Sequence, residues 1–222
     1  MTGEGIEYIG YVVNDFDDKF GVPRQSGMTE AESEVVFYPP YDVEEAFRDV
    51  EKFSHLWLLW KFDVPGGFSP TVRPPKMGGN KRVGVFATRS PFRPNAIGLT
   101  VVRLVEKRVK AGKVSLLVSG ADLKNGTRII DVKPYLPYAD SITGAADGFE
   151  SERVAAKLEV IVPDSVKSVL GEEKTEVLRE VLALDPRPGY KTDDGKEYGF
   201  KFGGKEIKFT VNGGVLTVLG AE

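Results

Sequence analysis

The sequence predicts a mainly β fold, in which an antiparallel, β-barrel-like N-terminal domain with one or two helices precedes a small α+β C-terminal domain. Short apolar runs recur along residues 6–136, and Gly, Pro and Asn separate them. After about residue 150 a helical pattern begins, followed by alternating apolar residues and Gly-Gly turns. Evenly spaced short strands with few helices are typical of sheets that close into barrels. We therefore predict domains at residues 1–150 and 151–222.

The strands of the first domain are predicted from apolar runs that stop at turn residues. The run FSHLWLLWKF has the length of a strand, and we expect Trp57 and Trp60 in the core. Before it, Asp42 is expected to cap a short helix over residues 43–53, with acidic residues in the first turn. An Ala111-Gly112 turn joins two later strands. The predicted strands cover residues 6–13, 35–38, 53–62, 84–90, 97–110, 114–123 and 127–136.

The C-terminal segment changes from a helical to an alternating pattern. One amphipathic helix is predicted over residues 163–185, because its apolar residues recur at helical spacing. The following DPRPGY ends this helix, since proline cannot continue it. Gly203-Gly204 and residues 212–214 supply turns for a small meander of hairpins.

Residue composition excludes several classes of site. The chain has no Cys, and its one His is His55. It can therefore form no disulfide, thiolate nucleophile or Cys-ligated zinc site, and a single His cannot build a multi-His site, so we expect no metal. No apolar run approaches the roughly 20 residues that cross a bilayer, and the N-terminus lacks a signal-peptide pattern. We expect a cytoplasmic protein with no membrane contact.

One segment of this acidic chain is strongly basic. The formal net charge is -3, yet no acidic residue occurs between Asp63 and Glu106. A segregated basic segment rich in Gly, Pro and Asn indicates an anionic partner that carries phosphate or carboxylate. The alternative is a basic surface loop with counter-charges from elsewhere in the fold. The basic residues of this segment are Arg73, Lys76, Lys81, Arg82, Arg89, Arg93 and Arg103.

The sequence ATRSPFRPN, at residues 87–95, is the strongest candidate anion receptor in the basic segment. Two prolines restrict its backbone, which lowers the entropic cost of presenting its arginines and hydroxyls. An arginine-braced turn is the alternative. The chain contains neither a GxxxxGK[ST] phosphate loop nor a GxGxxG fingerprint between a strand and a helix, so the usual nucleotide-binding folds are not indicated.

The stretch from HLWLLWKF through PTVRPPKMGGNKRVGVFATRSPFRPNAIGLTVVRL closely resembles the TrmO-type tRNA methyltransferases, also called the YaeB or TsaA-like family. VPRQSG at 22–27, GADLKNGTRIIDVKPYLPYAD at 120–140 and LDPRPGY at 184–190 extend the match. The resemblance implies a homodimeric β-barrel enzyme that uses S-adenosyl-L-methionine. It also implies methylation of N6 in the threonylcarbamoyladenosine beside the anticodon of tRNA.

The resemblance implies two groups of cofactor-binding residues, one around the VPRQSG and ATRS motifs and one in the GADL and DVKP segments. Asp63 and Val64 stand where family members often have His or His-Gln, so a contact from a His side chain is not carried over. The implied cofactor-binding residues are Pro23, Arg24, Gln25, Asp63, Val64, Arg89, Leu123, Asp131, Val132, Lys133 and Pro134.

The basic segment is assigned to anionic groups of the cofactor and the tRNA, because it would repel a positive sulfonium. Arg89 or Arg93 is expected to bind the threonylcarbamoyl carboxylate bidentately. Phe92, Tyr135 and Tyr138 are candidates for stacking on anticodon bases, with packing at the barrel mouth as the alternative. The predicted substrate-binding residues are Arg73, Lys76, Lys81, Arg82, Arg93 and Tyr135.

Methyl transfer to N6 requires alignment and the loss of a proton. Alignment of donor and acceptor alone contributes ~7–11 kcal/mol to such reactions. The adenine nitrogen becomes nucleophilic as its proton leaves, so a nearby carboxylate would assist, and Asp131 is the predicted catalytic base. The alternative is that Asp131 is a strand-end residue that binds a neighbouring backbone amide.

Two other functions stay open at this point. One is a non-catalytic barrel module that binds RNA or an anionic metabolite. The other, a hydrolase, is disfavoured because the chain has no Cys, one His and no nucleophile elbow. His55 is expected to be structural, with a site role as the alternative. Arg187 is expected either to contact RNA or a partner subunit, or to be a surface residue at the end of a helix.

Overall fold

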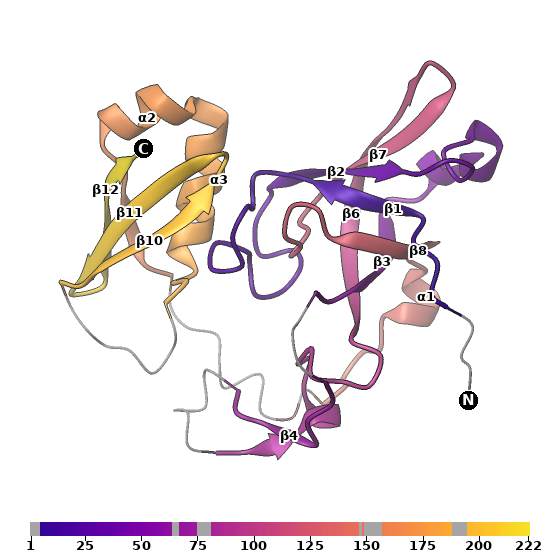
Figure 1. Ribbon diagram of the computed structural model, residues 1–222, viewed down its shortest axis with the longest axis horizontal. Coiled ribbons are helices and arrows are strands. Elements are labelled where there is room, and N and C mark those ends of the chain that lie inside the picture. The colour runs from indigo at the N-terminus through magenta and orange to yellow at the C-terminus, as the bar shows by residue number, and fades with distance from the viewer. Residues whose placement is uncertain (1–4, 64–66, 75–80, 147, 149–156, 188–194) are drawn as a thin grey trace.

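The computed structural model describes residues 5–63, 67–74, 81–146, 148, 157–187 and 195–222. Figure 1 shows a barrel beside a smaller C-terminal module of helices and strands. Six antiparallel strands close the barrel in the order β1-β2-β7-β6-β3-β8, which confirms the predicted antiparallel barrel. The barrel strands are β1 (Gly10–Val13), β2 (Glu32–Phe37), β3 (His55–Lys61), β6 (Ile97–Lys110), β7 (Lys113–Ser119) and β8 (Arg128–Pro134).

Strand β3 shows why the barrel forms. Its residues alternate between the core and the outer face, and Leu56, Leu58 and Trp60 are buried. The indole of Trp60 donates a hydrogen bond to Thr100 at 2.9 Å, so its polar atom is satisfied inside the barrel. The prediction that Trp57 lies in the core was wrong: it is half-buried on the outer face, and its indole donates to Asp140 at 3.0 Å.

Strand β6 joins the two halves of the barrel. Its first half pairs with β3 and its second half with β7, and the register with β7 shifts between Leu104 and Glu106. Such a bulge bends a strand and lets a small barrel close. The tight turn to β7 uses Ala111 at φ 52° and Gly112 at φ 74°, as the left-handed turn of a hairpin requires.

Three local predictions for the first domain need correction. Residues 43–53 form two 3-10 turns, Glu44–Phe47 and Val50–Lys52, separated by Asp49 in a left-handed conformation. Asp42 does not cap them, because Val43 holds that position without a side-chain hydrogen bond. Residues 84–90 are not a strand.

The short strand β5 (Val83–Gly84) ends at Gly84, and the 3-10 turn Val85–Ala87 follows it directly. In the described part of the chain, β5 forms a two-stranded sheet with the two-residue strand β4 (Thr71–Val72), outside the barrel. After β8, the short helix α1 (Pro137–Asp140) was not predicted.

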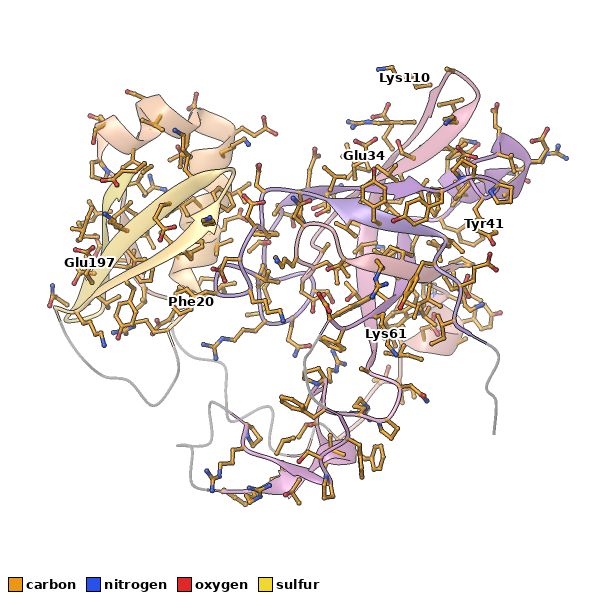
Figure 2. The ribbon with its side chains drawn as sticks, in the orientation of Figure 1. Phe20, Glu34, Tyr41, Lys61, Lys110 and Glu197 are labelled. Carbon is orange, nitrogen blue, oxygen red and sulfur yellow. The ribbon has the colours of Figure 1, made fainter. Side chains whose placement is uncertain are left out.

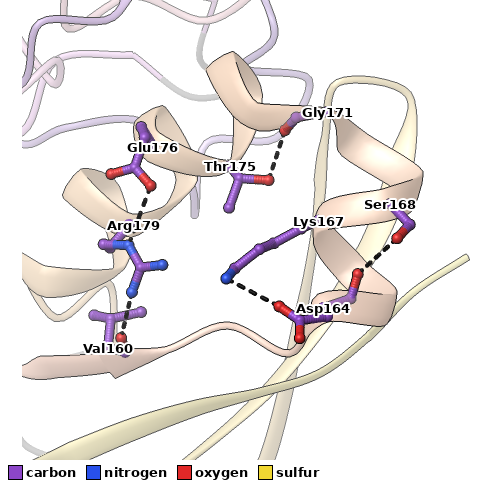
Figure 3. A network of polar contacts seen from close by, with 8 residues as sticks. All are labelled: Val160, Asp164, Lys167, Ser168, Gly171, Thr175, Glu176 and Arg179. Carbon is purple, nitrogen blue, oxygen red and sulfur yellow. Dashed lines mark hydrogen bonds and ion pairs between the residues drawn. The ribbon is translucent and has the colours of Figure 1, made fainter.

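The C-terminal module contains a sheet in the order β10-β11-β12-β9, with β9 parallel to β12. The predicted hairpins are confirmed as β10 (Glu197–Phe202), β11 (Lys205–Asn212) and β12 (Val215–Ala221), and β9 (Glu159–Ile161) is additional. The single predicted helix is two, α2 (Asp164–Leu170) and α3 (Glu172–Ala183), because Gly171 at φ 80° interrupts it. Thr175 and Arg179 then tie α3 to Gly171 and to Val160 (Figure 3).

The core of the C-terminal module includes residues from the first domain. Phe16 and Ala31, at the two ends of the loop between β1 and β2, are buried in this core. Figure 1 shows that loop lying between the barrel and α3. The barrel has a separate core built around Leu58, Leu116 and Ile129. Among the described helices, none is long and apolar enough to span a membrane.

Replacement of Gly98 by Ala should destabilise the barrel. A methyl group at Gly98 would meet the Trp60 ring at 2.2 Å, so we expect the free energy of unfolding to fall by about 1–3 kcal/mol. Urea denaturation measures this change. Gly84→Ala is the control, since Gly84 has φ −60° and no atom within 4 Å of the added methyl. Equal stability of the two variants would contradict the packing described for β3 and β6.

Candidate functional site

Three chain segments meet at one end of the barrel. The part of the basic segment that precedes β6 lies over this end, because the chain leaves β3 after Lys61 and returns at Ile97, which pairs with Lys61 (Figure 2). The loop between β1 and β2 reaches the same end, where Gly27 donates a backbone hydrogen bond to Gly120 at 2.9 Å. The segment that follows β7 is therefore brought beside both.

A contact between Gln25 and Arg89 joins two of these segments. Nη1 of Arg89 donates to Oε1 of Gln25 at 2.7 Å, although 64 positions separate them in the chain. Both side chains are exposed. The structure thus brings together one residue from each of two motifs to which a cofactor role was assigned. The exposed guanidinium keeps further donors for a carboxylate or a phosphate.

A buried polar chain ends beside Arg89. The Trp60 indole donates to Thr100 Oγ1 at 2.9 Å, and Thr100 Oγ1 donates to Asp122 Oδ1 at 2.6 Å. Burial raises the pKa of the Asp122 carboxyl above its ordinary value of 3.8, whereas the Thr100 hydrogen bond and the positive charge of Arg89 oppose this rise. A carboxyl that is half-buried beside an arginine is typical of a functional site.

Sequence reasoning missed Asp122. The available signal was a carboxylate placed between two apolar residues, Ala121 and Leu123, directly after a buried strand. An acidic residue in such a position is rarely buried unless a partner satisfies it. Its partner, Thr100, lies on a neighbouring strand, and the sequence alone does not reveal that pairing.

Arg93 braces its own loop. Its Nη1 donates to the carbonyl oxygens of Val85 at 3.1 Å and Thr88 at 2.6 Å, and its guanidinium lies 5.3 Å from the centre of the Phe86 ring. The hydroxyl of Thr88 also binds within the loop, to Val85 at 2.9 Å. These contacts are those of an arginine-braced turn, which was the alternative to an anion receptor. The role of Arg93 in substrate binding stays a prediction.

The remaining predicted residues of the basic segment differ in their contacts. Arg82 donates to Thr71 Oγ1 at 2.8 Å across the β4–β5 hairpin, and Arg73 and Lys81 are exposed. Asp63 is exposed and its carbonyl accepts from Lys19 at 3.0 Å. Val64 and Lys76 lie outside the described residues.

Arg24 points toward the C-terminal module. Pro23 is buried beside it, and the Arg24 guanidinium donates to the carbonyl oxygens of Arg187 at 2.6 Å and Asp185 at 3.4 Å. Burial lowers the pKa of Arg24, and the charge of Asp185 opposes that change. Arg187 is not the surface residue that was considered as an alternative, because its side chain is 11% exposed and forms an ion pair with Asp185 at 2.8 Å.

Residues 131–134 of the second predicted cofactor group lie on β8, across the barrel from β7. β8 and β7 are three strands apart in a barrel of six, so they occupy opposite sides. Asp131 pairs with Leu59 on the outer face, where its Oδ2 lies 2.8 Å from Lys133 Nζ and its Oδ1 accepts from the Val132 amide at 2.9 Å. Side chains on the outer face of β8 do not meet Arg89 within one chain.

The other residues of this group occupy separate positions. The Val132 side chain packs against the barrel core, and Pro134 is exposed. Leu123 is 1% exposed inside the barrel, so a ligand contact there would have to use its backbone. Tyr135 lies beside His55 and Trp57 at the opposite end of β3. Nδ1 of His55 lies 2.9 Å from the Ser54 hydroxyl.

The basic segment also carries exposed apolar side chains. Phe86 is 69% exposed and stacks on Phe68, while Leu99 is 55% exposed on the outer face of β6. Phe92 and Ile97 add to this surface. Exposed large apolar side chains gathered in one region mark an interaction surface.

Replacement of Asp122 by Asn should change how stability depends on pH. Because folding raises the pKa of Asp122, the folded state binds a proton more readily than the unfolded chain. This contribution to stability is complete below the unfolded pKa of about 4 and is lost as the pH rises through the folded pKa. Relative to Asp122→Asn, the wild type should therefore lose free energy of unfolding as the pH increases.

Urea denaturation at a series of pH values from about 4 to 7 measures this difference. Asp164→Asn, at a carboxylate that is 96% exposed, is the control for the loss of a carboxylate at the surface. A constant difference between the wild type and Asp122→Asn would contradict the burial of Asp122.

Comparisons with known proteins agree with this architecture. The chain is 43% identical over 209 residues to "tRNA (adenine(37)-N6)-methyltransferase" of Escherichia coli (strain K12), covering 89% of both chains. It is 38% identical over 204 residues to "Putative S-adenosylmethionine-dependent methyltransferase RcsF" of Pseudomonas aeruginosa, covering 87% of this chain and 86% of the relative.

The crystal structure of TrmO from Pseudomonas aeruginosa superimposes with a TM-score of 0.80 at 30% identity, and covers 100% of both chains. Residues 11–141 match the tRNA-methyltransferase O N-terminal domain, and residues 155–222 match the TrmO C-terminal domain. The chain therefore belongs to the TrmO family of tRNA methyltransferases.

Proposed function

We propose that this protein transfers a methyl group from S-adenosylmethionine to N6 of adenine 37 in tRNA, and that the preferred adenine carries a threonylcarbamoyl group. The relatives that share most of its length are named for this reaction or for this cofactor. The observation that carries the proposal is the Gln25–Arg89 contact at 2.7 Å, beside Asp122 and within a segment that has no acidic residue. A cytoplasmic location follows from a tRNA substrate.

The donor set at this end of the barrel fits the cofactor. Arg89 offers N–H donors to the amino-acid carboxylate, and the amide of Gln25 offers both a donor and an acceptor. The cofactor carries a positive sulfonium, which Arg89 would repel. Asp122 supplies negative charge beside Arg89 and reduces that repulsion. S-adenosylmethionine, when bound, supplies an electrophilic methyl group carried on sulfonium. The protein residues need to orient it and exclude water.

The basic segment suits an anticodon loop. Exposed Arg73 and Lys81 can bind phosphates, and exposed Phe86 and Phe92 can stack on unpaired bases. The threonylcarbamoyl group adds a carboxylate beside N6. Arg89 is better placed than Arg93 to bind this carboxylate or that of the cofactor, because Arg93 already donates to two carbonyl oxygens of its own loop.

The role of Asp131 as the base that accepts the N6 proton stays a prediction. Both of its carboxylate oxygens already have partners, Lys133 and the Val132 amide. These contacts favour the alternative in which Asp131 stabilises the strand.

A homodimer would combine residues that one chain keeps apart. Arg89 lies at the barrel end, whereas Asp131 and Lys133 lie on the outer face of β8, and exposed Leu99 and Phe86 offer apolar surface for a second copy. A two-fold dimer that packs the β8 face of one subunit against the basic segment of the other would create two composite sites.

Loss of the protein from cells should abolish one methyl group on threonylcarbamoyladenosine. Nucleoside mass spectrometry of tRNA from cells with and without the protein measures this, and an unchanged profile would support the non-catalytic binding module instead.

A transfer assay in vitro tests the finer proposal. We expect faster methylation of tRNA that carries threonylcarbamoyl than of tRNA that lacks it, and equal rates would contradict recognition of its carboxylate.

Mixing two inactive variants tests the composite site. Arg89→Ala and Lys133→Ala should each lower the rate, and after subunit exchange the mixture should recover about one quarter of the wild-type rate, because roughly half the dimers are mixed and each has one intact site. Transfer assays before and after exchange measure the recovery. Arg128→Ala mixed with Arg89→Ala is the control for dilution. Absence of recovery, with dimers present, would contradict a site shared between subunits.

A further inference from the structure

We propose that the C-terminal module acts as a clamp: it holds the loop of residues 14–31, here called the site loop, so that Gln25 stays against Arg89, with Arg24 as the positioning residue. This inference deepens the proposed function, because it assigns to the C-terminal module an effect on cofactor affinity. The module itself consists of the described residues 157–187 and 195–222.

Aromatic residues of the site loop complete the core of the C-terminal module. The Phe16 ring lies 5.9 Å from that of Phe202. Phe20 stacks on Tyr198 at 6.4 Å and lies 6.0 Å from Phe200, at the edge of the module (Figure 2). A methyl group at Gly21 would meet the Phe200 ring at 2.4 Å, so the backbone itself packs on the module. The site loop therefore belongs both to the barrel end and to the core of the C-terminal module.

Polar contacts hold both ends of the site loop to the module. Lys174 on α3 forms an ion pair with Asp15 at 2.6 Å, and the Gly203 amide donates to the Asp15 carbonyl at 2.8 Å. Near the other end, the Glu30 amide donates to Glu180 Oε2 on α3 at 2.8 Å. Contacts with α3 thus flank the Pro23-Arg24-Gln25 segment on both sides.

Arg24 fixes the middle of the site loop. Its guanidinium donates to the carbonyl oxygens of Arg187 and Asp185, immediately beyond the end of α3. Asp185 adopts φ 52°, a left-handed conformation, and its carboxylate pairs with the Arg187 side chain at 2.8 Å. That pairing offsets the charge of Arg187, so a second arginine can approach.

Gln25 follows Arg24 directly and turns to the opposite partner, Arg89. The chain bends at these two residues, and the observed contacts take Arg24 to the module and Gln25 to the barrel end. Any movement of the module relative to the barrel must therefore shift Gln25. A displacement of about 1 Å in a positioning group is enough to affect a site.

The test uses residues of the module that do not touch the site. Lys174→Ala combined with Glu180→Ala removes two anchors of the site loop. Arg179→Ala is the matched control, because Arg179 also lies on α3 and donates to a backbone carbonyl, that of Val160 at 2.8 Å, within the module (Figure 3). Arg24→Lys keeps the charge but loses the forked donor, and it provides a conservative second variant.

Two measurements are needed. Calorimetry with S-adenosylmethionine should give a dissociation constant about tenfold higher for the double variant, and a smaller increase for Arg24→Lys, whereas Arg179→Ala should match the wild type. Hydrogen exchange should quicken at the amides of residues 15–30 and also at residues 85–93, around Arg89. Exchange does not depend on any ligand.

The outcomes separate the clamp from the proposed function. Faster exchange at residues 85–93 with weaker binding, in the double variant and not in Arg179→Ala, supports the clamp. Unchanged exchange at residues 85–93, or equal affinity for the double variant and the control, overturns it. If the wild type does not bind the cofactor, the proposed function fails, and the exchange at residues 85–93 still decides whether the module holds the site loop against Arg89.

Discussion

The hydrogen bond from Trp60 to Thr100 sets the direction of the hydrogen bonds that lead from the barrel core to Asp122. An indole N–H can only donate, so Thr100 accepts at its oxygen and directs its single proton to Asp122. The carboxylate is thereby held by the barrel core with Arg89 beside it. Removal of the Thr100 hydroxyl would leave the buried Trp60 N–H without an acceptor, which costs about 1–3 kcal/mol. The position of the Asp122 carboxylate is thus set by residues inside the barrel.

The two arginines of the ATRSPFRPN loop have different tasks. Arg93 satisfies carbonyl oxygens of its own loop, as buried backbone groups require. Arg89 makes one contact with Gln25 and remains exposed. A loop that is already braced loses little conformational entropy when it binds a ligand, and an exposed guanidinium in such a loop can bind an anion without reorganisation. A single arginine could not perform both roles.

Short apolar runs limited by turn residues made the barrel predictable, whereas the loops depended on distant partners. The strand at residues 97–110 was predicted with its observed bounds, because it is a long run rich in Val and Leu that turn residues limit at both ends. Residues 85–90 pair with no strand among the described residues, and Val85–Ala87 form a 3-10 turn. Residues 43–53 have helical composition, yet Asp49 adopts a left-handed conformation and the helix cannot continue.

The candidate site shows the same division. Arg89 could be identified from its motif, because the motif itself makes the rigid loop. Asp122 could not, since its partner Thr100 is 22 positions away, and the pairing of strands alone brings them together. The partner of Arg24 is more than 160 positions away. Residue type indicates the chemistry that a side chain can perform, but the fold decides which partner occupies its donors.

The position of the site loop also changes how the two domains should be understood. The sequence divides near residue 150, and the family matches at 11–141 and 155–222 divide it similarly. The hydrophobic cores do not, because Phe16 and Ala31 lie in the core of the C-terminal module. The segment that precedes β2 must therefore pack against a helix synthesised more than 100 residues later. A site that depends on Gln25 reaches its final geometry only after both cores have formed.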